Sequence, residues 1–131
     1  MHYYKTISVS VLLFNKYKAV RTHCGLHSHM SKGEAEFCNV LQLEERAGVT
    51  RIVKLQPNVL LTEAKIRIIP DWLVFRIKSV VEEEQIYIDF KGYDSQSWKR
   101  NRKLWKHYGP APMEVWKKNS KGFYLHEVIN V

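Results

Sequence analysis

The chain has 131 residues, a length that predicts one domain over residues 1–131 and suffices to bury a hydrophobic core without disulfide staples. Its 21 Lys and Arg outnumber 13 Asp and Glu, and the formal net charge of +8 favours a polyanionic partner with salt-sensitive binding. It has no internal repeat, low-complexity linker or apolar run of membrane-spanning length, which argues against a repeat protein, a multidomain chain and a membrane partner.

The first predicted element is a β-strand within residues 7–14, where the residues at odd positions are all apolar and serine occupies positions 8 and 10. The segment is too short to cross a bilayer, and no small-residue cleavage site follows it, so we do not expect a signal peptide. We expect residues 1–14 to contribute an added strand, which could also be exchanged between two copies of the chain.

Next come Cys24, His27 and His29, with His23 and Cys38 nearby. Their spacing matches no zinc motif, so we expect a loop that leads into the following helix and that could bring a histidine near phosphate. Two cysteines and no export signal favour the reducing cytoplasm, where a disulfide is not expected.

Residues 31–47 have the apolar spacing of a helix, with Gly48 as its stop signal. Four side chains share its apolar face: Glu34, Phe37, Cys38 and Leu41. A glutamate on that face looks inward, which makes Glu34 a candidate site residue and Glu36 the fallback. The alternative for Glu34 is a capping box with Ser31, in which the carboxylate only closes the start of the helix.

The central strands are predicted at residues 50–61, 66–77 and 85–90, with the acidic run 82–84 as a turn. An antiparallel hairpin centred near Val80 would pair Asp71 with Asp89. Side-chain alternation would put Lys91 on the same face as Asp89, about 7 Å away, while Phe90 points into the opposite layer and leaves its carbonyl near the site. Both aspartates interrupt apolar strands, where an uncompensated carboxylate would be costly to bury.

These groups suit the hydrolysis of a phosphodiester. Asp71, Asp89 and the Phe90 carbonyl offer hard oxygen ligands to a divalent cation. Lys91 can orient the attacking water or stabilise the developing charge. A carboxylate-x-lysine triplet is common, however, and the chain contains a second one at residues 63–65, so the triplet alone carries little weight.

Residues 95–108 form the second predicted helix, which Gly109-Pro110 ends. Its expected apolar face comprises Trp98, Leu104, Trp105 and Tyr108, and we interpret the tryptophans as core residues. A lysine stripe on another face could carry DNA to the site, although such stripes are more often merely solvated. The basic residues predicted to contact DNA are Lys16, Lys18, Arg21, Lys99, Arg100, Arg102, Lys103 and Lys106. A short strand at 113–116 and a last strand or short helix at 123–131 complete the chain.

The order Glu34 on a helix, Pro70-Asp71 at a strand start and Asp89-Phe90-Lys91-Gly92 resembles the PD-(D/E)XK nuclease superfamily. Over residues 15–108 the chain is also similar to a small phage and prophage family of endonuclease I or Holliday-junction-resolvase type. The matching motifs are Asn15-Lys16-Tyr17, Gly25, residues 31–36, Ala47-Gly48, Gln56-Pro57, Pro70-Asp71 and residues 89–92.

The resemblance implies an α/β domain with a restriction-endonuclease-like core, a mixed β-sheet flanked by helices. It implies that Asp71, Asp89 and the Phe90 carbonyl bind Mg²⁺, for which Mn²⁺ substitutes, that Glu34 binds or orients a second ion or water, and that Lys91 assists the nucleophile. The triplet begins with aspartate, where glutamate is commoner, which shortens the ligand and leaves its chemistry unchanged. Residence in a bacterial host cell, with a phage origin, is also implied.

The sequence hypothesis is a Mg-dependent endodeoxyribonuclease that selects branched DNA such as Holliday junctions in recombination and works as a homodimer, which suits the cutting of two strands. One alternative is a nicking, mobile-element or restriction-type endonuclease of the same fold. Another is a basic DNA-binding module that does not cut.

Overall fold

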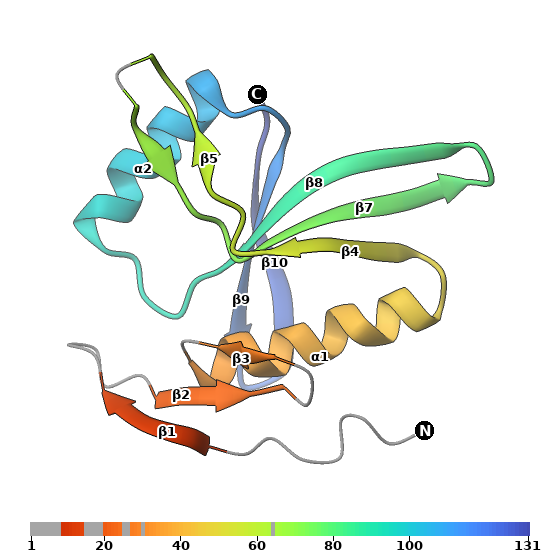
Figure 1. The fold of residues 1–131 in the computed structure, drawn as a ribbon, viewed down its shortest axis with the longest axis vertical. Helices are drawn as coiled ribbons and strands as arrows, with labels where there is room; N and C mark the ends of the chain where they lie inside the picture. Colours follow the sequence, from red (N-terminus) through yellow and green to blue (C-terminus); the bar gives the residue numbers. More distant parts are fainter. Residues whose placement is uncertain (1–8, 15–19, 25–26, 30, 64) are drawn as a thin grey trace.

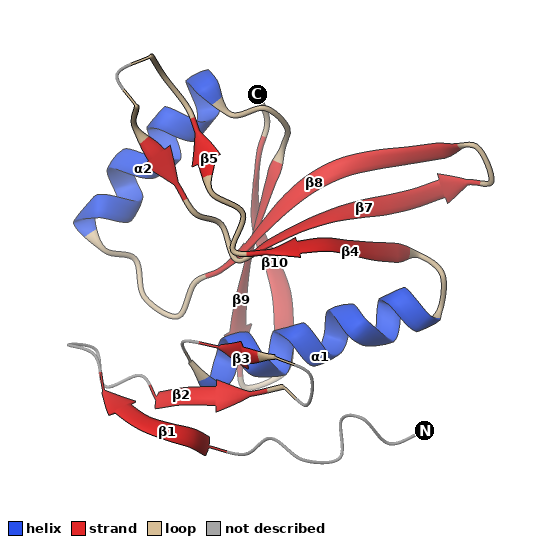
Figure 2. Cartoon of the chain, viewed as in Figure 1, coloured by secondary structure: helices blue, strands red, loops and turns tan. Residues whose placement is uncertain are grey.

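A computed structural model of the chain describes residues 9–14, 20–24, 27–29, 31–63 and 65–131 (Figure 1). Within them lie ten strands and two helices (Figure 2). The elements are, in chain order, β1 (Val9–Phe14), β2 (Val20–His23), β3 (Ser28–His29), α1 (Lys32–Arg46), β4 (Thr50–Leu55), β5 (Val59–Leu60), β6 (Arg67–Ile68), β7 (Trp72–Ser79), β8 (Glu82–Phe90), α2 (Gln96–Tyr108), β9 (Met113–Asn119) and β10 (Gly122–Ile129). The molecule is a single small α/β domain, as the sequence predicted.

A mixed sheet of five strands organises the domain, in the order β10-β9-β8-β7-β4. Its neighbours pair antiparallel except β8 and β9, which are parallel and are joined through α2. The β7–β8 pairing joins Trp72 to Ile88 and Val74 to Ile86, a constant sum of 160 that confirms the hairpin register predicted around Val80. Continuing that register brings residues 71 and 89 together at the open end of the hairpin.

The two helices cover opposite faces of this sheet, and each covers its own apolar core (Figure 1). On the α1 side, the core is made mainly of Phe37, Cys38, Leu41, Trp72, Val74, Ile86 and Ile88. On the α2 side, it is made mainly of Tyr87, Trp98, Trp105, Met113, Val115 and Ile129. Residues at even positions of β8 therefore face α1, while Tyr87 at an odd position faces α2. The core role predicted for the two tryptophans is confirmed.

The start of α1 lies unusually close to the end of β8. The Ser31 hydroxyl caps the helix by accepting a hydrogen bond from the backbone N–H of Glu34, at 3.1 Å. A Cβ atom at Gly33 would lie 2.6 Å from the Phe90 ring, so any other residue at this position would require the ring to shift. This contact places the first turn of α1 beside the residues that follow Ile88.

Several predicted boundaries are wrong in informative ways. The strand expected at 66–77 is two strands, because Pro70 lacks a backbone N–H for the ladder and the chain bends at Asp71. The strand expected at 50–61 is likewise split into β4 and β5, which belong to different sheets.

The acidic run 82–84 is the beginning of β8, and the turn is made by the two residues before it. Cations on neighbouring parts of the sheet let this acidic run adopt a β-strand. Arg51 pairs with Glu83 at 3.0 Å, and Lys78 pairs with Glu84 at 3.4 Å. Near the other end of the chain, Tyr108 is exposed rather than part of the apolar face of α2, and residues 122–129 form a strand. Neither helix in the described residues is long and apolar enough to span a bilayer.

Candidate functional site

The two predicted aspartates meet at the open end of the β7–β8 hairpin. Asp71 lies directly before β7, and its Oδ2 accepts a hydrogen bond from the backbone N–H of Phe90 at 2.8 Å. Asp89, the penultimate residue of β8, is buried with 4% of its surface exposed. The two carboxyl groups are close enough for each to influence the pKa of the other. The hairpin register therefore does what the sequence predicted, and brings two carboxyl groups into contact.

Lys91 completes this group from the residue after β8. Its Nζ lies 2.7 Å from Asp89 Oδ2 and 4.4 Å from the centre of the Trp98 ring. Its backbone N–H donates to the carbonyl of Trp116, at 2.9 Å, which extends the β8–β9 pairing by one residue. The ammonium is thus fixed by an ion pair on one side and by an aromatic face at the start of α2 on the other.

Glu34 reaches the same place from α1. It is buried, it forms a hydrogen bond with Asp71, and its Oε2 lies 3.4 Å from His29 Nδ1 in β3. Ser31 provides its half of a capping box, but the Glu34 carboxylate interacts with His29 and Asp71. The fallback residue Glu36 lies away from this group and pairs with Lys118 at 3.1 Å. Glu34, Asp71, Asp89 and Lys91 are hereafter the acidic cluster.

The electrostatics of the acidic cluster are those of crowded carboxyl groups. Asp71 is half-exposed as a residue, yet burial of its carboxyl group is the largest cause that raises its pKa well above the ordinary value. The charges of Asp89 and Glu34 and the hydrogen bond with Glu34 raise it further. Burial also raises the pKa of Asp89, although the charge of Lys91 and hydrogen bonds with Lys91 and Asp71 oppose that shift. The two aspartates therefore retain protons that ordinary carboxyl groups lose.

The ring and the backbone of Phe90 make contacts in different places. Its ring packs on the α1 side at 6.1 Å from Phe37 and 5.8 Å from Phe123, as the predicted alternation requires. The backbone group seen to contact the acidic cluster is its N–H, which Asp71 accepts; sequence reasoning had singled out only its carbonyl. The role of that carbonyl as a metal ligand stays a prediction.

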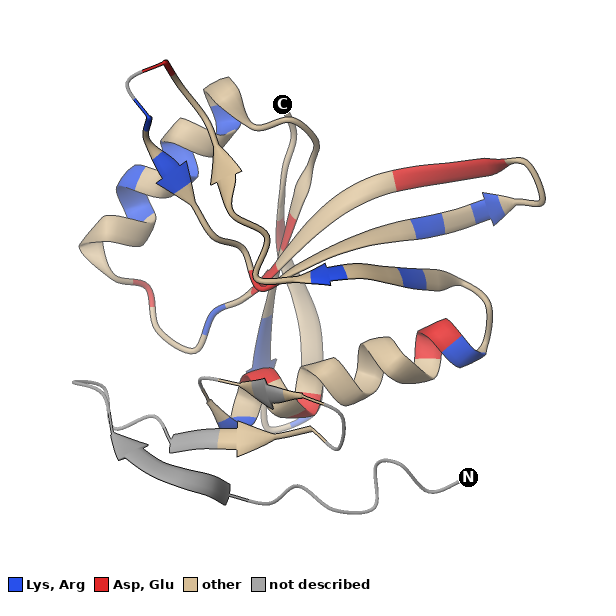
Figure 3. Ribbon diagram, viewed as in Figure 1, with Lys and Arg blue, Asp and Glu red and all other residues tan. Residues whose placement is uncertain are grey.

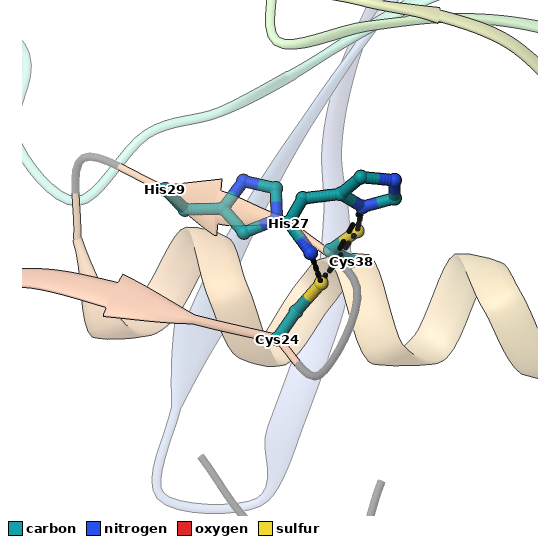
Figure 4. A group of neighbouring side chains, drawn as sticks. All are labelled: Cys24, His27, His29 and Cys38. Carbon is teal, nitrogen blue, oxygen red and sulfur yellow. Dashed lines mark hydrogen bonds between the residues drawn. The ribbon is translucent and has the colours of Figure 1, made fainter. Parts of the chain in front are cut away.

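A second group of side chains lies beside the acidic cluster. Cys24, His27, His29 and Cys38, hereafter the Cys/His cluster, point toward one another from the β2–β3 region and from α1 (Figure 4). One ligand atom from each lies within 4.8 Å of all the others. Sequence spacing had not predicted this convergence, and His29 had no assigned contact with Glu34. The available signal was the position of Cys38 on the same helix face as Glu34, one turn further along.

His29 contacts both clusters. Burial lowers its pKa, but hydrogen bonds with Cys24 and Glu34 and the charges of both groups outweigh burial and raise the pKa to about 9. His29 is thus a buried group whose surroundings favour a positive charge.

The predicted DNA contacts on α2 lie on its solvent side. Lys99, Arg100, Lys103 and Lys106 are exposed, and basic residues recur along this helix (Figure 3). Arg102 is also exposed but is held by Glu127, with a 2.8 Å hydrogen bond from Nε to Oε1. Lys16 and Lys18 lie outside the described residues, as does the side chain of Arg21. Since Lys91 packs on Trp98, the first turn of α2 adjoins the acidic cluster.

Comparisons with known proteins find no protein-family model, no curated protein and no solved structure that matches this chain.

Proposed function

We propose that this protein is a metal-dependent DNA endonuclease built on a restriction-endonuclease-like core. The observation that carries the proposal is the convergence of Glu34, Asp71, Asp89 and Lys91 from α1, the start of β7 and the end of β8. Three carboxyl groups beside one lysine are costly to gather in a partly buried place without a function for them. The mixed sheet with one helix on each face suits the core that the sequence resemblance implies.

Magnesium, with manganese as a substitute, suits the donor set of the acidic cluster. Asp71 and Asp89 supply hard carboxylate oxygens. Burial is the largest cause that raises both pKa values, and a bound cation could neutralise these buried carboxylates in place of protons. Mg²⁺ bound there would lower the pKa of a water and neutralise charge on the phosphate. Glu34, which interacts with Asp71 from α1, would bind or orient a second ion or the water.

The chain's own residues would then orient the reaction. Phe90 N–H fixes the Asp71 carboxylate at 2.8 Å, so this ligand is preorganised by the backbone. Lys91, held between Asp89 and the Trp98 ring, would direct its remaining protons to the attacking water or to the phosphate. Lys99 and Lys103 on α2 would contact the phosphate backbone, which supplies affinity without base readout.

We favour branched DNA, such as a Holliday junction, as the substrate and a homodimer as the active unit, since both follow from the resemblance to resolvase-type nucleases. The test compares a four-way junction, a flap, a linear duplex and a single strand, each with Mg²⁺, with Mn²⁺ and without added divalent cation. Symmetric, metal-dependent cuts confined to the junction are expected. Cutting of linear duplex would favour a restriction or mobile-element role.

Asp89→Asn is expected to lower cleavage by about 10³-fold or more, because it removes a charged ligand while keeping the shape of the side chain. DNA binding should persist. Lys91→Ala should lower the rate more than the affinity. Asp94→Asn is the matched control, since Asp94 is exposed and pairs with Lys117 at 3.1 Å outside the acidic cluster. Full turnover by Asp89→Asn would refute the site, and binding without cleavage of any substrate by the wild type would favour the non-catalytic module.

A further inference from the structure

We propose that the Cys/His cluster binds one Zn²⁺ ion as a structural site. Its ligands would be Cys24 after β2, His27 in the following turn, His29 in β3 and Cys38 in α1. The proposal concerns a different set of donors from the acidic cluster and does not depend on nuclease activity.

The distances within the cluster are those of a tetrahedral zinc shell. Zn–S bonds of about 2.3 Å and Zn–N bonds of about 2.0–2.1 Å place two sulfurs about 3.8 Å apart and a sulfur and a nitrogen about 3.5 Å apart. The two Sγ atoms are 3.4 Å apart, and His27 Nδ1 is 3.5 Å from each of them. Three of the four donors therefore already have nearly the required separations.

The fourth donor, His29, has a nitrogen available on its inner side. Its Nε2 is buried and has no hydrogen-bond partner of normal geometry among the described residues, while the Cys24 side chain lies close enough to interact with the ring. Its Nδ1 lies 3.4 Å from Glu34 Oε2. A zinc-binding histidine commonly donates its second ring N–H to a carboxylate, which fixes the tautomer and the ring orientation. His29 has this arrangement, with Nε2 left to ligate.

The surroundings also suit two thiolates. The Gln42 side-chain amide donates to both sulfurs, at 3.2 Å to Cys24 and 3.4 Å to Cys38, and the backbone N–H of His27 donates to Cys24 at 3.3 Å. Binding of Zn²⁺ would release the two thiol protons and the Nε2 proton of a charged His29, so that two thiolates, two neutral imidazoles and the ion carry no net charge. A neutral assembly of this kind is the form in which such groups are best buried.

The donor types select the metal and the role. Two sulfurs and two imidazoles in a tetrahedral arrangement favour zinc over magnesium or calcium, which prefer oxygen. Four protein ligands leave no coordination position for a substrate, and both cysteines have no exposed surface, so the site is structural. The alternative of a disulfide requires the sulfurs to be about 2.05 Å apart, whereas Cys24 Sγ and Cys38 Sγ are 3.4 Å apart.

A zinc ion here would fasten the β2–β3 hairpin to the middle of α1. It would also fix His29, and through it the Glu34 carboxylate, against which Asp71 is hydrogen-bonded. His29 would thus be a positioning residue for the acidic cluster as well as a ligand.

The test measures metal in the intact wild-type chain, purified under reducing conditions without chelator from cells grown with zinc. One zinc per chain is expected by elemental analysis. Replacement with Co²⁺ should give the absorption bands of tetrahedral cobalt together with thiolate-to-cobalt charge transfer. The intact mass should show two free thiols after the metal is removed.

Variants locate the site. Cys38→Ser and His27→Asn should weaken zinc binding by more than the roughly 10- to 100-fold that loss of an outer-shell partner costs, measured by competition with a chromophoric chelator. His27 is only partly buried, so its variant preserves the test if Cys38→Ser does not fold. His23→Asn is the control, because His23 precedes Cys24 but lies outside the cluster, and it should retain full zinc.

Several results would overturn the proposal: no zinc in the reduced protein, a cobalt spectrum without thiolate charge transfer, or a mass lower by two hydrogen atoms from a Cys24–Cys38 disulfide. Equal zinc binding by His27→Asn and wild type would also overturn it. All of these readouts are independent of DNA cleavage, so failure of the nuclease proposal would leave them unaffected.

Discussion

The acidic cluster and the Cys/His cluster are neighbours with opposite chemical characters. Both take a residue from the buried face of α1, Glu34 in one and Cys38 in the other, four positions apart. The acidic cluster gathers carboxyl groups in a buried place, and burial is the largest cause that raises the pKa of Asp71 and Asp89. The Cys/His cluster gathers soft donors in a nearly closed shell, where one ion would satisfy every member.

A metal bound to the Cys/His cluster would stabilise the fold, whereas the acidic cluster depends on the fold to keep its carboxyl groups close together. Crowded carboxyl groups lower stability at neutral pH and persist where a function needs them. A closed set of sulfur and nitrogen donors adds stability when its metal is bound. The His29–Glu34 contact joins the two, so substitutions on either side test whether they behave as one unit or two.

Glu34→Gln should affect both clusters at once, because Glu34 belongs to the acidic cluster and also supports His29. We expect cleavage to fall by about 10²- to 10³-fold through loss of a charged group. Zinc affinity should fall by about 10- to 100-fold, since the amide is a weaker acceptor for the imidazole N–H. Cleavage assays and chelator competition on the same preparation measure both.

Glu36→Gln is the matched control, on the same helix but paired with Lys118 at the surface. It should change neither quantity. If Glu34→Gln lowered cleavage and left zinc affinity intact, the clusters would be independent; the reverse result would remove Glu34 from the nuclease site.

Asp71→Asn should raise the stability of the fold and abolish cleavage, because the acidic cluster serves the reaction and not the fold. The pKa of Asp71 is raised in the folded chain, so the proton stabilises the fold at low pH and this stability is lost as the pH rises through the folded-state pKa. Asparagine cannot lose a proton and can still accept from Phe90 N–H. We expect a gain of about 1 kcal/mol at neutral pH, from thermal unfolding without added magnesium.

The difference in the free energy of unfolding between the variant and the wild type should shrink as the pH falls toward the ordinary pKa range of a carboxyl group. Magnesium should also reduce this difference, because it would stabilise only the wild type. Asp94→Asn should show no such gain. An Asp71→Asn variant less stable than the wild type at every pH would mean that the carboxylate supports the fold and is not strained by its neighbours.

The features of the fold and of the acidic cluster that could be predicted from the sequence are those with a local physical cause. The pairing of residues 71 and 89 follows from one tight turn and a period of two, so a register argument suffices. The first residues of α1 and α2 follow from Ser31 and Ser95, whose hydroxyls accept hydrogen bonds at 3.1 Å from the backbone N–H of the third residue beyond each. The inward direction of Glu34 follows from the helical period.

The Cys/His cluster could not be predicted in this way. Cys24 and Cys38 lie on different elements, and the β2–β3 hairpin must fold back on α1 before their sulfurs meet. Motif spacing describes ligands within one loop, whereas tertiary packing sets this site. The split of residues 66–77 also has a tertiary component, because the Asp71 carbonyl accepts from Gln56 N–H at the end of β4, at 2.8 Å. The restriction-endonuclease-like core stays a prediction.

The smallest expected effects belong to the basic face of α2, where neither cluster is touched. Lys99→Ala and Lys103→Ala should each weaken DNA binding modestly and equally across sequences, and each should reduce the slope of log K against log salt by about 1. Arg102→Ala should change the slope less, because Glu127 already neutralises that guanidinium.

Binding isotherms at several salt concentrations measure these slopes, with every variant made in the Asp89→Asn background so that cleavage does not intervene. Equal slopes in all three variants and in the parent would mean that DNA does not cross this helix.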